Sequence, residues 1–375
     1  MKQNHLLFSA VTALAFLASC SSDNVVADAS QEADASIKFN TSMGNMTRGT
    51  TLYDQSTNNI TQFWVHAFKS DGSIYFTDNA TNSGSGWSLA GGNQKWPSDG
   101  SDVTFFAYTP QLTSPSFTST SGSVDVTQTD NPENQEDLLT AYAKQGYNAT
   151  QGNSSVTLKF KHAFAKIIVK AKNESSDAND YRIEVKGVKL RKIENSGKLT
   201  FQTTAEGSPT WTPGTNKQNY VIGGGEPGAT DYSVSLTKGD AASDIMNRNA
   251  FLVIPQTVSP WASSTIASDD TSISIYCKIT QGDAGTKIFP TSSSGVDYAW
   301  LAVPFNTTTT WKAGNSYIYT IRFFANGTGG AGQGDPDDIN AGGGSVIQDV
   351  NIGFTTEIGD WEPGNNTGES IPSES

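Results

Sequence analysis

Few residues in this chain could carry out acid–base, nucleophilic or metal chemistry. Apart from His5 near the N-terminus, the histidines are His66 and His162, and each lies in an apolar run that favours a strand. Neither has further ligands at the spacing of a zinc motif, so we interpret both as structural histidines. The sequence has no G-x-S-x-G, H-E-x-x-H or P-loop pattern. It therefore predicts no catalytic site, no metal site and no cofactor.

Cysteine and aspartate offer two further candidates. Cys277 lies in the alternating segment 272–279, which favours a half-buried strand thiol over a nucleophile. Asp335, Asp337 and Asp338 flank a proline and could offer oxygens to Ca²⁺. They lack the EF-hand pattern and lie in a Gly-rich stretch, so we interpret them as a solvated turn.

The eight tryptophans could form a platform on which sugars stack. Two of them, Trp64 and Trp300, lie inside apolar runs and are expected in the core. The other six stand near predicted turns and are expected to be more open: Trp87, Trp96, Trp211, Trp261, Trp311 and Trp361. Aromatic residues at such corners more often serve packing than binding, so the sequence alone assigns no sugar site.

Cys20 is the residue with the clearest chemistry. An apolar run of about 13 residues, 6–18, precedes it, which is a signal-peptide length and short of the ~20 residues of a membrane-spanning helix. Leu17-Ala18-Ser19-Cys20 resembles the lipobox of bacterial lipoproteins, in which the leader is cut between Ser19 and Cys20 and the cysteine is acylated. Multiple acyl chains anchor a protein stably. By the same resemblance, Ser21 and Ser22 fit sorting to the outer membrane.

Composition indicates the kind of structure that must present these residues. With 36 glycines and only 16% charged residues, the chain favours an exported all-β fold. Its net charge of −13 makes nucleic acid an unsuitable partner. Expected strands lie at 36–40, 62–68, 73–76, 102–108, 181–190, 198–202, 231–236, 250–254, 271–280, 299–303 and 317–324, with a long run at 158–170. The best helical candidate, 134–143, is short.

The expected organisation follows the chain in order. After the leader, residues 1–19, comes a flexible tether at 20–35. Two β-sandwich domains follow, at 36–154 and 155–361, and a disordered tail at 362–375. The second domain contains a Gly-rich linker, 326–344, expected to be flexible coil, and a terminal strand, 345–354. That strand places Val346, Val350, Ile352 and Phe354 on one face. It must pair with its own sheet or with that of another molecule.

The order of these landmarks resembles the Bacteroidales fimbrillin family, the Mfa-like and major-fimbrial-subunit-like lipoproteins. The resemblance covers nearly the whole chain after the leader, and its most specific piece is the run Leu158–Ile167. Its other pieces are the lipobox at Cys20, Ile37–Phe39, Thr47–Leu52, Phe63–Phe68, Lys95–Pro97, Val103–Tyr108, Asp137–Leu139, Phe251–Gln256 and Trp311–Tyr317. It implies an all-β fold of two transthyretin-like β-sandwich domains in tandem.

The same resemblance implies a function. Such subunits reach the outer membrane as lipoproteins, and a trypsin-like protease cuts some of them after an arginine beyond the first strand. Arg48 matches that position, which would leave Gly49 as the new N-terminus. The lipid and first strand then leave, and a strand from another fimbrial subunit enters the exposed groove; 346–354 is the candidate donor. Two alternatives keep the lipid: a subunit that stays anchored, and a surface glycan-binding lipoprotein.

Overall fold

The computed structural model describes residues 36–43, 60–84, 86–147, 155–176, 180–225, 231–247, 249–261, 264–290, 295–325, 330–341, 346–361 and 369–370. Every regular element in these ranges is a strand or a short 3-10 helix, the latter at Pro132–Asn134 and Ile339–Ala341. The prediction of an all-β fold is confirmed. None of the helical segments described has the length and apolar character to cross a membrane.

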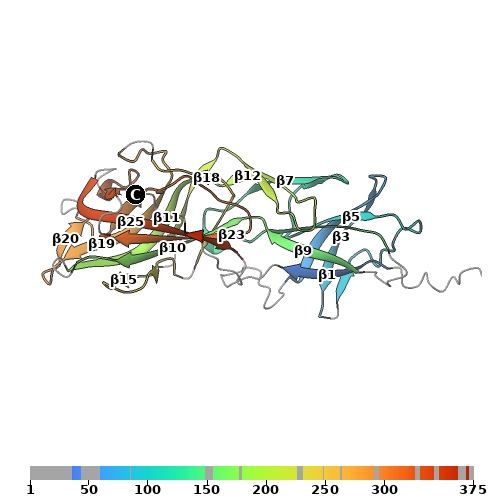
Figure 1. Cartoon of the computed structure of the whole chain (residues 1–375), viewed down its shortest axis with the longest axis horizontal. Coiled ribbons are helices and arrows are strands. Elements are labelled where there is room, and N and C mark those ends of the chain that lie inside the picture. The colour runs from blue at the N-terminus through green and yellow to red at the C-terminus, as the bar shows by residue number, and fades with distance from the viewer. Residues whose placement is uncertain are drawn as a thin grey trace, which may run out of the picture. The chain divides into compact units, whose positions relative to one another are not determined.

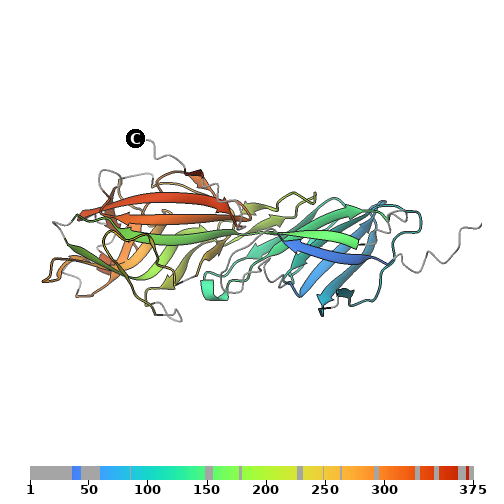
Figure 2. The same ribbon diagram turned by 60° about the horizontal axis from the view of Figure 1, so that its bottom comes forward.

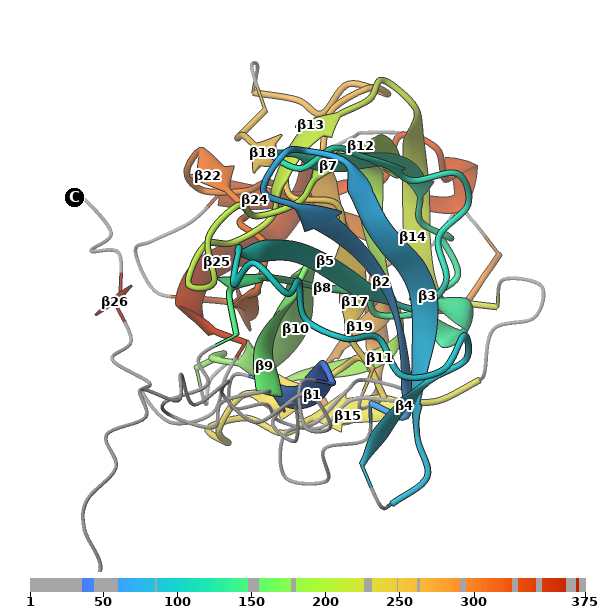
Figure 3. The ribbon, with the colours of Figure 1, turned by 90° about the vertical axis from the view of Figure 1, so that its right-hand side faces the viewer.

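The first sheet has seven strands, and its two faces are buried in different cores. Along β2, the inward positions Phe63, Val65 and Ala67 alternate with more open ones, and this period of two made the strand readable in the sequence. In order across the sheet the strands are β1 (Lys38–Met43), β9 (Ser155–His162), β8 (Leu139–Gln145), β5 (Val103–Thr109), β2 (Gln62–Lys69), β3 (Ile74–Asn82) and β4 (Trp87–Leu89). Figure 3 shows β1 beside β9 at one end of this sheet.

A four-stranded sheet covers the opposite face of the first sheet (Figure 1). Between the two layers, Phe68, Phe106 and Tyr108 of the first sheet pack with Val124 and Leu199 of the second. The strands of the second sheet, in order, are β13 (Thr210–Pro213), β12 (Ser196–Thr200), β7 (Gly122–Thr127) and β6 (Ser116–Phe117). The chain therefore returns to this core after residue 195 to complete it.

The third sheet has thirteen strands and carries the largest core. Its main order is β14 (Lys217–Gly223), β11 (Tyr181–Glu194), β19 (Ser272–Gln281), β21 (Ala299–Val303), β24 (Gly330–Gly334), β25 (Val346–Asp360), β23 (Asn315–Phe323), β10 (Ala165–Asn173) and β16 (Ser243–Asp244). Four further strands pair onto it: β15 (Val234–Leu236), β17 (Phe251–Val253), β20 (Thr286–Phe289) and β26 (Glu369–Ser370). A separate pair joins β18 (Thr257–Val258) to β22 (Thr309–Thr310). In Figure 2, β25 is the red strand that runs along β23.

Several expectations are corrected by this arrangement. The helix expected at 134–143 is wrong: a 3-10 helix at Pro132–Asn134 is followed by β8. Leu139, Ala141 and Ala143 all face one core, so the strand period prevails over helical propensity. The strand β9, assigned by sequence to the second domain, pairs with β1 and β8 in the first sheet. The division into two domains stays a prediction, because residues 36–375 group as one compact unit.

The Gly-rich stretch is also more ordered than expected. Residues 330–334 form β24, which pairs with β21 on one side and β25 on the other, so flexible coil is wrong for this part of 326–344. Within the tail expected to be disordered, β26 pairs with Glu357 and Ile358 of β25. The physical reason is that β24 covers only the first part of β25, which leaves the 357–358 part with a free edge for β26.

Candidate assembly site

The first strand, β1, closes one end of the seven-stranded sheet. It pairs in parallel with β9, from Lys38 opposite Ser155 to Met43 opposite Phe160. On its other side it is held more lightly: Ile37 N donates to Gln94 O at 2.7 Å, and Ser36 forms an isolated bridge with Lys95. One full ladder and these local bonds therefore tie the backbone of β1 to the rest of the fold.

The side chains of β1, and of Ile37 directly before it, fill the core beneath the strand. Ile37, Phe39 and Met43 are 6%, 5% and 4% exposed. The Phe39 ring meets the edges of two others, with centroids 5.5 Å from Phe63 and 5.9 Å from Phe105 at interplanar angles of 82° and 89°. Edge-to-face contacts of this kind are favourable beyond simple burial. Loss of β1 would therefore uncover both an unpaired β9 edge and an apolar groove.

The residues predicted to be processed lie outside the described ranges. Ser19 and Cys20 precede β1 in the chain, while Arg48 and Gly49 follow it and precede β2. Met43 ends β1, so a cut after Arg48 would separate this strand covalently from every strand that follows.

The candidate donor strand lies in its own sheet. β25 pairs antiparallel with β23 from Asn315 opposite Asp360 to Phe323 opposite Ile352. On its other side, Val346 and Ile352 are opposite residues of β24. Ile352 is 5% exposed. The side chains of the other three predicted donor positions, Val346, Val350 and Phe354, lie outside the described part of the structure.

A buried charge cluster fixes the chain directly after β24, in the segment that leads to β25. Asp335 is fully buried, and its carboxylate lies 2.8 Å from Lys189 Nζ and 3.0 Å from Arg191 Nε. It also accepts a hydrogen bond from Ser274 Oγ at 3.0 Å. Asp337 is paired with Arg191 Nη2 at 2.8 Å. The solvated turn expected at 335–338 is therefore wrong for Asp335: two buried cations supply the counter-charges that make its burial tolerable.

A stacked tryptophan fixes the chain just after β25. The Trp361 ring lies against His162, with centroids 4.0 Å apart and an interplanar angle of 7°. The Lys166 ammonium lies 5.7 Å from the same ring. His162 Nδ1 is 2.7 Å from a carboxylate oxygen of Asp137. Burial lowers the pKa of Lys166, and the charge of Asp137 opposes this shift. Trp361, 2% exposed, thus ties the end of β25 to strands β9 and β10.

The family model for fimbrillin-like proteins matches residues 47–361. The chain belongs to the fimbrillin-like family. The match starts beyond β1 and ends at Trp361, so it spans the sheets without their first strand, β1, and their last, β26. No curated protein sequence matches this chain.

One solved structure supports the fold. A fimbrial protein from Bacteroides vulgatus ATCC 8482 superposes with a TM-score of 0.55 at 17% identity, covering 87% of this chain and 99% of that one. Two candidate cell adhesion proteins are less similar. The one from Bacteroides uniformis ATCC 8492 has a TM-score of 0.41 at 16% identity, covering 88% and 98% of the two chains. The one from Parabacteroides distasonis ATCC 8503 has 0.45 at 10%, covering 88% and 96%. At these scores neither contributes to the fold assignment.

In this fimbrillin-like protein the other chemical candidates have structural surroundings. His66 lies between Tyr108 and Thr77, at 3.4 and 3.2 Å from their hydroxyls. Cys277 is fully buried, and burial raises the pKa of its thiol. No group of three or more His, Cys, Asp or Glu side chains in the described ranges is arranged to hold a metal ion.

The tryptophans of this fimbrillin-like protein divide differently from the prediction. Trp96, Trp311 and Trp361, expected to be open, are buried, while Trp64, expected in the core, is partly exposed. Trp87, Trp211 and Trp261 are partly exposed, and Trp300 is buried, as expected. The missed burial of Trp361 matters most, because this residue marks the end of β25. Its only sequence signal was its position directly after an alternating strand.

Proposed function

We propose that this protein is a structural subunit of a cell-surface fimbria, exported to the outer membrane as a lipoprotein on Cys20 and assembled by strand exchange. The observation that carries the proposal is the segment 37–43: its strand β1 has one full ladder, and its three apolar side chains, Ile37, Phe39 and Met43, fill the core. Membership of the fimbrillin-like family supports the structural role over an enzymatic one.

Release of β1 has a direct physical consequence. A protease that cuts after Arg48 leaves β1 bound only by non-covalent contacts, and the lipid at Cys20 leaves with it. The vacated site would offer the backbone N–H and C=O groups of β9 and a groove shaped for alternate apolar side chains. Added strands use these features, since main-chain hydrogen bonds give affinity and side-chain pockets give specificity.

The proposed donor is the C-terminal strand of another subunit. Val346, Val350, Ile352 and Phe354 are alternating apolar residues of β25, as are Ile37 and Phe39 around the start of β1. In the free subunit β25 pairs within its own chain. Donation therefore requires that it leave this sheet.

The arginine content allows a sharp test. The chain has five arginines: Arg48, Arg182, Arg191, Arg248 and Arg322. Digestion of the detergent-extracted protein with an Arg-specific protease should yield one new N-terminus, at Gly49, followed by SDS-resistant ladders. Arg48→Ala should abolish both products. Arg248→Ala, which changes another arginine outside the described ranges, should abolish neither.

A second experiment tests whether β25 is the donor strand. A synthetic peptide covering residues 345–361, added at the moment of cleavage, should suppress the ladders, while a scrambled peptide should not. Clean cleavage at Arg48 that yields only monomers would refute assembly by strand exchange. Mass spectrometry of protein shed from cells would distinguish the anchored alternatives, because these retain acylated Cys20 instead of a free Gly49.

A further inference from the structure

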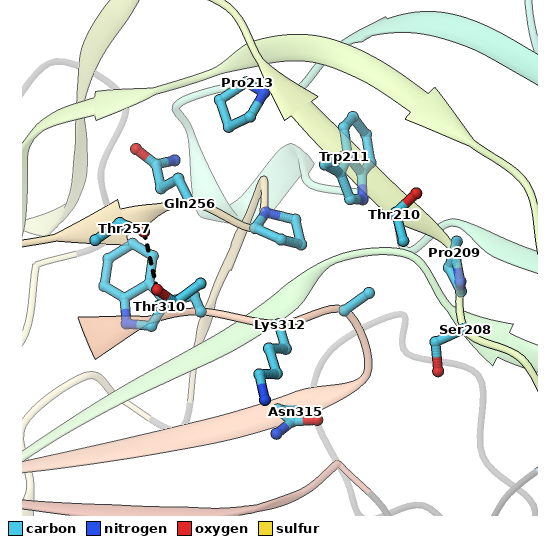
Figure 4. A pocket seen from close by; sticks show the side chains of 13 residues that line it. Ser208, Pro209, Thr210, Trp211, Pro213, Gln256, Thr257, Thr310, Lys312 and Asn315 are labelled. Carbon is cyan, nitrogen blue, oxygen red and sulfur yellow. Dashed lines mark hydrogen bonds between the residues drawn. The ribbon is translucent and has the colours of Figure 1, made fainter.

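A cleft of about 470 Å³ opens between β13 and the β18–β22 pair (Figure 4). Ligand sites in proteins commonly have volumes of ~300–1,000 Å³ and combine apolar walls with a few polar groups. Figure 4 shows Trp211 and Pro213 on one wall, and Thr310 and Lys312 on the other. Neither β1 nor β25 contributes a lining residue, so a ligand in this cleft would contact neither of the strands proposed to exchange.

Trp211 gives the cleft a fixed aromatic surface. Its ring stacks on Phe164 with centroids 5.6 Å apart at 26°. Its indole N–H donates to the Ala163 carbonyl oxygen at 2.6 Å. The ring is only partly buried. Phe164 therefore covers one face of the Trp211 ring, and Ala163 binds its N–H. These contacts hold the other ring face in place before a ligand arrives, so binding does not cost side-chain entropy at Trp211.

The opposite wall is polar and carries one cation. Thr257 and Thr310 are exposed, and their hydroxyls lie 2.9 Å apart. Lys312 is exposed, and among the ion pairs of the described residues none includes it. This ammonium group favours a ligand with a negative charge at this wall of the cleft.

We propose that this cleft binds a saccharide that bears a carboxylate, such as a uronic or sialic acid residue. The apolar face of a sugar ring stacks on Trp211, the threonine hydroxyls bond to sugar hydroxyls, and Lys312 pairs with the carboxylate. A purely apolar ligand would leave the hydroxyls and the ammonium group without partners, which costs free energy. A neutral saccharide would use only the first two contacts.

The test uses matched acidic and neutral probes on the detergent-extracted full chain. Hyaluronan hexasaccharide is compared with chitohexaose, and 3′-sialyllactose with lactose, by tryptophan fluorescence and calorimetry. At least one acidic probe should bind about fivefold more tightly than its neutral counterpart. Lys312→Gln should weaken that binding by about fivefold, as expected for one exposed ion pair, and should bring the acidic probe closer to the neutral one.

Variants of the aromatic wall complete the test. Trp211→Ala should abolish binding, and Trp211→Phe, which keeps a ring on Phe164, should retain part of it. Two controls should leave binding unchanged: Lys198→Gln, an exposed lysine on neighbouring β12, and Trp87→Phe on β4. The proposal is overturned if no probe binds, if neutral probes bind as tightly as acidic ones, or if Lys312→Gln has no effect. Lys312 is exposed, so its substitution should leave the fold intact. The result with Lys312→Gln can therefore be interpreted even if a Trp211 variant misfolds.

Discussion

Phe39→Ala tests whether β1 is a removable part of the core. The side chain is 5% exposed, and its ring meets Phe63 and Phe105 edge-on. Truncation of a buried phenylalanine costs about 3–5 kcal/mol in free energy of unfolding. Because β1 has one full ladder, its docking free energy is expected to be smaller than the stability of the whole fold. The measured loss in the intact precursor should therefore be about 3 kcal/mol, or the docking free energy of β1 if that is smaller.

After processing, Phe39→Ala should no longer affect the free energy of unfolding. Once a cut after Arg48 has released β1, the variant and the parent protein are the same polypeptide from residue 49 onward. Urea unfolding, followed by circular dichroism, should then give coincident curves. Phe251→Ala is the matched control, since this fully buried ring also has an edge-on partner, Tyr220, with centroids 6.2 Å apart. It should lower the stability before and after the cut.

Two results would refute this reasoning. A difference above ~0.5 kcal/mol that persists after cleavage at Arg48 would mean that β1 remains docked without its covalent link. A loss below ~1 kcal/mol in the intact precursor would mean that either the Phe39 ring or the docking of β1 as a whole contributes little to stability, contrary to the burial and ring contacts of Phe39.

Three further predictions concern the third sheet. Asp335→Asn leaves buried Lys189 without its counter-charge and Arg191 with Asp337 alone, and should lower the stability by about 3–5 kcal/mol in urea unfolding, whereas exposed Asp283→Asn should change nothing measurable. Partial burial raises the pKa of Glu174, but hydrogen bonds and charges from neighbouring cations, Arg322 foremost, outweigh it and hold the pKa below its ordinary value of 4.5. Its contribution to stability is thus complete above pH 4.5 and is lost as the pH falls through the lowered pKa, so Glu174→Gln should flatten the acid side of a stability–pH curve. Cys277 should resist iodoacetamide in the native protein and react fully in urea, and rapid native labelling would contradict its complete burial.

The strands were largely readable from the sequence because one face of each sheet is consistently apolar. In β9, for example, Val156, Leu158 and Phe160 are buried at alternate positions. This pattern shows which side chains point inward but not which sheet the strand joins. The pairing of β9 with β1, about 117 positions earlier in the chain, depends on contacts that no local window contains.

Only part of the candidate assembly site could be predicted from the sequence, for a related reason. The apolar strand at Ile37 and Phe39, the arginine after it and the alternating strand near the C-terminus are local patterns. Asp335 looked like a solvated turn because its partners, Lys189 and Arg191, lie on β11 far back in the chain. Glycine-rich sequence favours flexible coil. Here it forms β24 because strands on both sides satisfy its backbone groups.

The two strands proposed to exchange differ in how firmly they are held. β1 lies at the end of its sheet and leaves by breaking one ladder. β25 lies between β23 and β24, with the Asp335 cluster before it and the Trp361 stack after it. Spontaneous loss of β25 would break two ladders and expose Ile352 together with the His162 ring face. A free β25 should therefore be rare, which protects the subunit from premature pairing at an exposed edge. It follows that donation of β25 would be driven by the contacts that the strand gains in the groove vacated by β1. Removal of β1 would therefore be the step that allows assembly to begin.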